Sequence, residues 1–159
     1  MSNVKIAYGT QGVAITITLN SLASGSLRQS TAIDNTSNLY RDALVQFKIK
    51  TGASGVSATG FVRCFAYASA DNGTDYGDGA TGTDGSFTPT SPPNLRLLTV
   101  LNAVANATTY TSDPVSVAAL YGGTLPPKWG IVIDNETAAT LDGSAGGTVW
   151  YQGAFETVV

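Results

Sequence analysis

The chain contains no histidine and only one cysteine in 159 residues. Histidine is the usual proton-transfer group near neutral pH, so its absence excludes Ser-His-Asp and Cys-His catalytic arrangements. The single cysteine, Cys64, allows neither a disulfide within the chain nor a zinc site built from cysteines. Because Cys64 lies in an apolar segment, we expect it to be a small buried core residue.

Charged residues are also scarce. Lys and Arg number 8 and Asp and Glu number 11, which together make 12% of the chain and leave a formal net charge of −3. Without a run of basic residues, the chain has no attraction for phosphates, so we expect no nucleic-acid partner. Solubility must come largely from Thr, Ser, Asn and Gly, as is typical of a rigid extracellular or particle-bound surface.

The chain has no long hydrophobic run. No stretch approaches about 18 apolar residues, and the first residues lack the apolar region of a secretory signal. We therefore expect a protein that is made in the cytoplasm and is not anchored in a membrane. The length fits one domain of about 150 residues, and no linker or change in composition divides it. The prediction is a single domain over 1–159.

The clearest pattern that is present is an alternation of period two. In 13–19 and 43–50, large apolar residues fall on every second position, which indicates strands with one buried face. Segment 61–70 has bulky residues on one face and small ones on the other, so we expect it to be covered on both sides, with a neighbouring subunit as one cover. Further strands are predicted at 27–33, 95–101, 115–120, 129–134 and 148–155, with 4–8 as an edge strand. Segment 101–107 is the only candidate for a turn or two of helix.

About eight principal strands, separated by turns rich in Gly, Ser and Pro and without βαβ alternation, predict an all-β fold. The expected architecture is an antiparallel two-sheet sandwich of jelly-roll type. An immunoglobulin-like sandwich is the nearest alternative, but its Cys…Trp…Cys spacing is absent. Residues 1–11 are predicted to form an extended N-terminal arm. Residues 71–93, which hold four of the eleven acidic residues, are predicted to form a long projecting loop.

Two patterns in the sequence could indicate a catalytic or cofactor site, and neither is convincing. A glycosidase needs two carboxylates across a cleft, but the candidates lie beside turns, where acidic residues are commonly solvated; they are Asp134, Glu136, Asp142 and Glu156. Segment 77–82 matches G-x-G-x-x-G, yet it lies in an acidic loop and not between a strand and a helix. We predict no catalytic residue and no cofactor.

The acidic loop also offers oxygen ligands for a calcium ion at Asp71, Asp75 and Asp78. The order differs from that of an EF-hand, because Tyr76 stands where that motif has glycine. We predict a solvated loop and no metal site.

Aromatic and arginine side chains are the remaining candidates for contacts. The last two predicted strands carry aromatic residues, for which core packing is the first interpretation and a subunit interface or sugar-stacking surface is the alternative; they are Trp129, Trp150, Tyr151 and Phe155. Four arginines in or beside strands would need partners if buried; they are Arg28, Arg41, Arg63 and Arg96. Pairing between subunits with Asp34 or Asp42 is left open.

Three segments resemble small virion structural proteins of tailed bacteriophages: YRDALVQFKIK at 40–50, SPPNLRL at 91–97 and LPPKWGI at 125–131. The likeness extends from about Val13 to Phe155. Some proteins of that size class are capsid decoration, or cement, proteins with a jelly-roll fold. The resemblance implies a non-enzymatic protein on the outer capsid surface of the virion, made in the host cytoplasm.

The partners expected from this resemblance are a second copy of the chain, as a dimer or trimer, and the major capsid protein, with no nucleic acid and no membrane. We expect capsid or subunit contacts at Val4, Lys5, Tyr8, Asp75, Tyr76, Trp150 and Tyr151. One alternative function is a receptor- or carbohydrate-binding module of a tail fibre or spike, which would use Trp150, Tyr151 or loop aromatics for stacking. A metal-dependent or carboxylate hydrolase is another.

Overall fold

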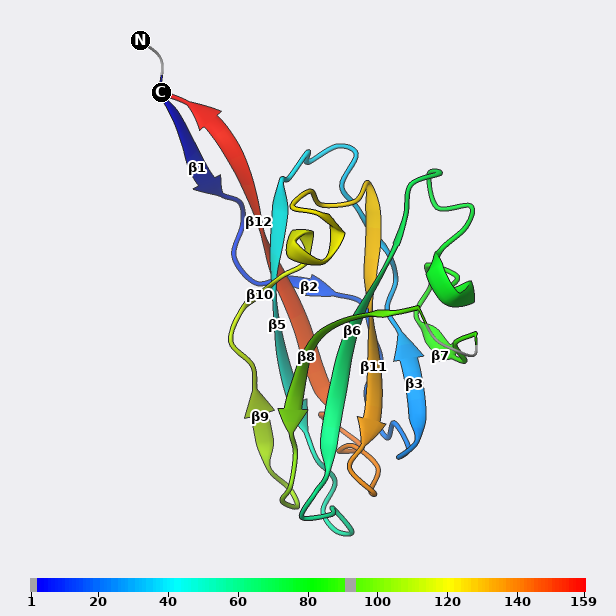
Figure 1. The fold of residues 1–159 in the computed structure, drawn as a ribbon. Helices are drawn as coiled ribbons and strands as arrows, with labels where there is room; N and C mark the ends of the chain where they lie inside the picture. Colours follow the sequence, from blue (N-terminus) through cyan, green and yellow to red (C-terminus); the bar gives the residue numbers. More distant parts are fainter. Residues whose placement is uncertain (1–2, 91–93) are drawn as a thin grey trace.

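The protein is an all-β sandwich of two antiparallel sheets, described here from a computed structural model that covers residues 3–90 and 94–159 (Figure 1). Its twelve strands are β1 (Val4–Tyr8), β2 (Val13–Ile15), β3 (Ser26–Gln29), β4 (Ile33–Asp34), β5 (Asp42–Lys50), β6 (Phe61–Ser69), β7 (Gly85–Phe87), β8 (Arg96–Asn102), β9 (Thr109–Thr111), β10 (Val115–Ser116), β11 (Lys128–Glu136) and β12 (Gly147–Val158). Two short 3₁₀ helices are η1 (Gly77–Gly79) and η2 (Ala118–Tyr121). None of the helices in the described residues is long and apolar enough to cross a membrane.

Sheet A is built around β12 and β5, which pair from Gly147 opposite Ile49 to Ala154 opposite Asp42. The other edge of β12 pairs with both β1 and β2, and the other edge of β5 pairs with both β9 and β10. Sheet B has the order β7-β3-β11-β6-β8, and β4 pairs with β11 beside β3. Strands that follow each other in sequence therefore often lie in opposite sheets.

The core lies between the sheets and follows the predicted alternation. Val45, Phe47 and Ile49 of β5 are fully buried. They face Cys64 and its neighbours on β6, within one cluster of buried residues. The two sheets are also joined by an edge-to-face contact between Trp129 of β11 and Tyr151 of β12, whose ring centroids are 5.4 Å apart. Such burial of apolar area is the main source of the sandwich's stability.

The predicted two-sheet antiparallel sandwich is confirmed, but the strands differ in number and extent. The structure has twelve strands where the sequence predicted about eight. Segment 115–120 is a strand only at Val115–Ser116 and continues as η2, where the Asp42 carboxylate accepts a hydrogen bond from the Ala118 backbone N–H. Segment 101–107 forms no helix, since β8 continues to Asn102 and an irregular turn follows.

The loop predicted at 71–93 packs in part on the outer face of sheet B and does not project as a whole. Tyr76 lies edge-on against Tyr67 of β6 at 5.3 Å between ring centroids. Ala80 and Phe87 are buried with Tyr67 and Val132 in a second, smaller apolar cluster. Residues 91–93 lie outside the described residues. This loop of the same chain covers the Tyr67 end of the outer face of β6, whereas Phe61, Arg63 and Phe65 on that face stay partly exposed.

Candidate interaction surface

The acidic residues considered for catalysis are each paired with a cation. Arg63 Nη2 lies 2.6 Å from Asp134 Oδ2 and 3.5 Å from Glu136 Oε1. Glu156 pairs with Arg41 at 2.8 Å, and Asp142 pairs with Lys50 at 3.0 Å. The Lys50 ammonium, together with backbone N–H groups of the following turn, holds the pKa of Asp142 well below its usual range. A general acid needs a raised pKa, so Asp142 is unsuited to that role.

The cysteine is equally unsuited to nucleophilic chemistry. Cys64 is fully buried in β6. Burial, with a smaller contribution from the charge of Asp134, raises the pKa of its thiol far above the ordinary value. A thiol reacts as its thiolate, so Cys64 is a packing residue, as the sequence predicted.

The acidic loop uses its carboxylates to hold its own backbone. The Asp71 carboxylate accepts hydrogen bonds from the Ser69 hydroxyl and from the backbone N–H groups of Thr74 and Asp75. The Asp78 carboxylate accepts from the backbone and side chain of Asn94. Within 3–90 and 94–159, no group of three or more metal-ligating side chains is placed to hold an ion.

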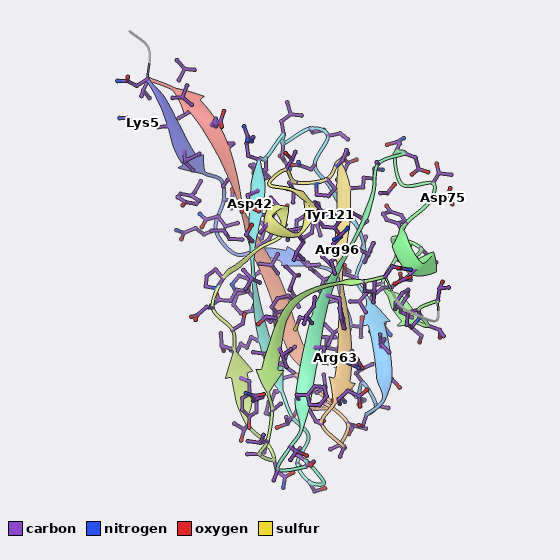
Figure 2. The ribbon with its side chains drawn as sticks, viewed as in Figure 1. Lys5, Asp42, Arg63, Asp75, Arg96 and Tyr121 are labelled. Carbon is purple, nitrogen blue, oxygen red and sulfur yellow. The ribbon has the colours of Figure 1, made fainter. Side chains whose placement is uncertain are left out.

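The arginines have partners within the chain. Arg28 Nε donates to Asp84 at 2.7 Å, and Arg96 lies over the ring of Tyr121 at 5.6 Å from its centroid (Figure 2). The two acids suggested for pairing between subunits are also engaged internally. Asp34 lies 3.7 Å from Lys128, and Asp42 caps η2.

The most distinctive surface is a two-stranded ribbon formed by Val4–Tyr8 of β1 and Ala154–Val158 of β12. The pairing of β12 with β5 ends at Ala154, so the rest of the ribbon extends beyond the sandwich, at the upper left of Figure 1. At its tip, Asn3 and Val159 exchange two backbone hydrogen bonds of 3.0 Å. A two-stranded ribbon alone is at best marginally stable in water, so an additional contact would stabilise it.

One face of the ribbon is mostly apolar and exposed; its one charged residue, Glu156, lies opposite Ile6 and pairs with Arg41 at 2.8 Å. Every second residue of β1 points to this face, and Val158 lies opposite Val4. We call the four large apolar residues on this side the apolar ribbon face. Their exposed fractions are 63% for Val4, 60% for Ile6, 59% for Tyr8 and 68% for Val158. The opposite face is anchored to the sandwich, because Phe155 packs on Tyr40 with ring centroids 6.1 Å apart.

The outer face of sheet A continues from the apolar ribbon face along β12. Side chains alternate between the two faces of a strand. Since Val149 and Tyr151 point into the core, the outer side of β12 carries Trp150, Gln152, Ala154 and Glu156. Trp150 is partly exposed. Two of the predicted contact residues in β1, Val4 and Tyr8, therefore lie on the same sheet face as Trp150.

The other predicted contacts are not brought to this face. Lys5 is exposed on the opposite side of the ribbon from Val4. Asp75 is exposed at the far side of the molecule from Lys5 (Figure 2), and Tyr76 is occupied by its contact with Tyr67. Tyr151 was predicted at a contact surface, but it is only 7% exposed because its ring packs on Trp129 in the core.

The structure adds residues that the sequence analysis did not select. Ile6 and Val158 complete the apolar ribbon face, and the alternation of Val4, Ile6 and Tyr8 was a signal that could have identified Ile6. Gln46 lies directly opposite Trp150. That pairing depends on the register between distant strands, which no local pattern reveals.

Comparison with protein-family models, with curated proteins and with solved structures found no match for this chain.

Proposed function

We propose that this chain is a non-enzymatic structural protein of a tailed-bacteriophage virion. Its role would be that of a capsid decoration protein, which oligomerises on the outer capsid surface and bridges subunits of the major capsid protein. Binding to the assembled shell, but not to its separated subunits, stabilises the shell by mass action. The observation that carries the proposal is the protruding ribbon with its exposed apolar face.

The strand order supports a jelly-roll fold, which is part of this proposal. Three rows of the sheets consist of two short strands in line, namely β1 with β2, β3 with β4, and β9 with β10. When each pair is counted as one row and β7 is set aside, eight rows remain in two four-row sheets. When the rows are numbered in chain order, sheet A has the order 1-8-3-6 and sheet B has the order 2-7-4-5. These are the orders of two interleaved Greek keys, as in a jelly roll.

The ribbon supports a role in binding neighbours. Sheet edges and large apolar patches that remain exposed invite association with another chain. In the described residues, β1 is the last strand of sheet A and has no neighbour on its outer edge. A neighbour that covers Ile6 and Tyr8 would remove apolar area from water, and each fully buried side chain of this size contributes about 1.5–3 kcal/mol.

The proposal is tested with heads of the phage that encodes the chain, purified from a strain in which this gene is deleted. Wild-type protein should co-sediment with these heads and raise the temperature at which they release DNA. The double substitution Ile6→Ser and Tyr8→Ser should weaken this binding by about tenfold or more, because two of the four exposed apolar side chains of the ribbon lose their contacts.

Leu39→Ser is the matched control, since Leu39 is 72% exposed but lies outside the ribbon. This variant should bind as the wild type does, and circular dichroism should show all three proteins folded. If wild-type protein does not bind to heads, the decoration function is wrong. If the ribbon variant binds as tightly as the control, the ribbon is not the contact element.

A further inference from the structure

Trp150 lines a pocket on the outer face of sheet A. Its cross-strand neighbours are Gln46 on β5 and Ala14 on β2. Small residues on the β2 side leave the indole partly uncovered: Ala14 is exposed, and a side chain at Gly12 would begin 3.8 Å from Trp150 Cδ1. The other tryptophan, Trp129, is fully buried.

The pocket has a volume of about 370 Å³ and carries no charge. Its lining consists of Gln11, Gly12, Leu44, Gln46, Pro114, Trp150, Tyr151 and Gln152. This volume lies at the lower end of the range of small-molecule sites. Because no lining side chain is ionised, a phosphate, carboxylate or ammonium group would be desolvated there without a charged partner.

Two amide side chains beside Trp150 are held in place. Gln46 Nε2 donates to the Ser112 carbonyl at 2.9 Å, and Gln152 Nε2 donates to the Gly9 carbonyl at 3.1 Å. Neither Oε1 accepts a hydrogen bond from a residue that the structure describes. Each amide therefore keeps an acceptor oxygen and a second N–H for a ligand, at little further cost in side-chain entropy.

We infer that this pocket binds a neutral saccharide, with one pyranose ring stacked on the indole of Trp150. The apolar C–H face of a sugar ring matches the aromatic face, and its hydroxyl groups match the donors and acceptors of Gln46 and Gln152. A purely apolar ligand would leave these amides without partners, which costs binding energy. A sugar is a neutral class of ligand that satisfies both parts of the lining.

The same sheet face has room for more than one sugar ring. A second pocket of about 290 Å³ is lined in part by Lys48, Thr109 and Thr148. Lys48 and Thr148 lie opposite each other. They form the next cross-strand pair on the same face, two residues along each strand from the pair of Gln46 and Trp150. Two residues along a strand span about 7 Å, so an oligosaccharide on Trp150 would reach Thr148. We therefore expect oligosaccharides to bind more tightly than monosaccharides.

This inference does not rest on capsid decoration, because a saccharide site would serve a receptor-binding module equally well. Its test is separate from the binding of phage heads. The full chain is screened on an array of neutral glycans and then titrated calorimetrically with maltohexaose, cellohexaose, mannohexaose and the best array ligand. Binding should also change the tryptophan fluorescence of the wild type.

Trp150→Ala should weaken binding by about tenfold or more, and Gln46→Ala by a smaller factor. Trp150→Phe keeps an aromatic ring, so it should retain part of the affinity but lose the fluorescence change, since Trp129 is buried. Leu39→Ala is the control, as an exposed apolar residue outside both the ribbon and the pocket lining, and should bind as the wild type does.

If none of the array glycans or the three hexasaccharides binds, the inference is wrong. It is also wrong if Trp150→Ala binds as tightly as Leu39→Ala. Should Trp150→Ala fail to fold, unchanged affinity and an unchanged fluorescence response in Trp150→Phe would overturn it equally.

Discussion

Gly130 of β11 lies beneath the ring of Tyr67, its cross-strand partner on β6. A Cβ atom at position 130 would lie 2.3 Å from Tyr67 Cζ and from Tyr67 Oη. The ring cannot easily move away, because its hydroxyl donates to the Ser30 carbonyl at 2.7 Å and its face is covered by Tyr76. The absence of a side chain at Gly130 is thus what admits Tyr67 to the second apolar cluster.

We expect Gly130→Ala to destabilise the fold by about 1–3 kcal/mol, the cost of overpacking a well-packed site, with about 1 kcal/mol more if the Tyr67 hydrogen bond is lost. Urea unfolding would measure the change. Gly77→Ala is the matched control, since a Cβ there meets nothing within 4 Å. Equal free energies of unfolding for the two variants would contradict this account of Gly130.

At the scale of elements, the described part of the loop, 71–90, is attached by side chains to sheet B and to the segment after β2. Asp84 accepts hydrogen bonds from Thr18 and Arg28, and Gln29 exchanges two with Thr81. Phe87, which is 6% exposed, lies opposite Leu27 in the pairing of β7 with β3. The loop is therefore a covering layer of the sheet and not a free appendage.

Phe87→Ala should detach this layer, because the second apolar cluster loses one of its two buried aromatic side chains, the one that the loop itself contributes, while the core between the sheets is untouched. Limited digestion with proteinase K, followed by mass spectrometry, should then find early cuts within 76–90 while the sandwich strands stay intact. The exposed Asp75→Ala should be digested as the wild type is. Equally slow cutting in both variants would show that Phe87 does not hold the loop.

The sequence predicted those strands in which apolar and polar residues alternate locally, because that alternation reports the buried face directly. In β5, half-buried residues alternate with buried ones, so its position and inward face were predictable. Strand β9 was missed because Thr109–Thr111 is short and nearly all polar. Strand β7 was missed because Gly85–Phe87 lies within an acidic, glycine-rich segment, where only pairing with β3 makes it a strand.

The candidate surface was predictable only in part, for a related reason. The aromatic residues at Tyr8 and Trp150 could be selected from the sequence as candidates for contacts. Their placement on one face, and the position of Gln46 beside Trp150, depend on the register of β12 with β1 and β5. Register joins residues more than 100 positions apart and is fixed by the packing of the whole sheet.

At the scale of the whole molecule, titratable groups favour the folded state over a middle range of pH. Hydrogen bonds from Thr36 and Ser69 lower the pKa of Asp34 and Asp71, respectively, and Lys50 lowers that of Asp142. Burial opposes the effect at Asp84, yet bonds from Arg28 and Thr18 leave its pKa lowered. In contrast, burial raises the pKa of Tyr121 to about 12 against the lowering effect of Arg96, and burial raises that of Cys64 as well.

These directions predict how the free energy of unfolding depends on pH. A carboxylate whose pKa is lowered by folding stabilises the protein above its ordinary pKa of about 4, and this contribution is lost as the pH falls through the folded value. A thiol or phenol whose pKa is raised stabilises the protein below its ordinary pKa of about 8.5 or 10, and this contribution is lost as the pH rises. With no histidine in the chain, no side chain of ordinary pKa titrates between about pH 5 and 8.

We therefore expect a plateau in the free energy of unfolding between about pH 5 and 8, with a fall on the acid side below about pH 4 and on the alkaline side above about pH 9. Urea unfolding across this range would measure it. Asp84→Asn and Asp142→Asn should each reduce the acid slope, because the substituted residue no longer takes up a proton on unfolding. A change between pH 5 and 8 as large as the acid fall would require a buried group with a strongly displaced pKa and would contradict these assignments.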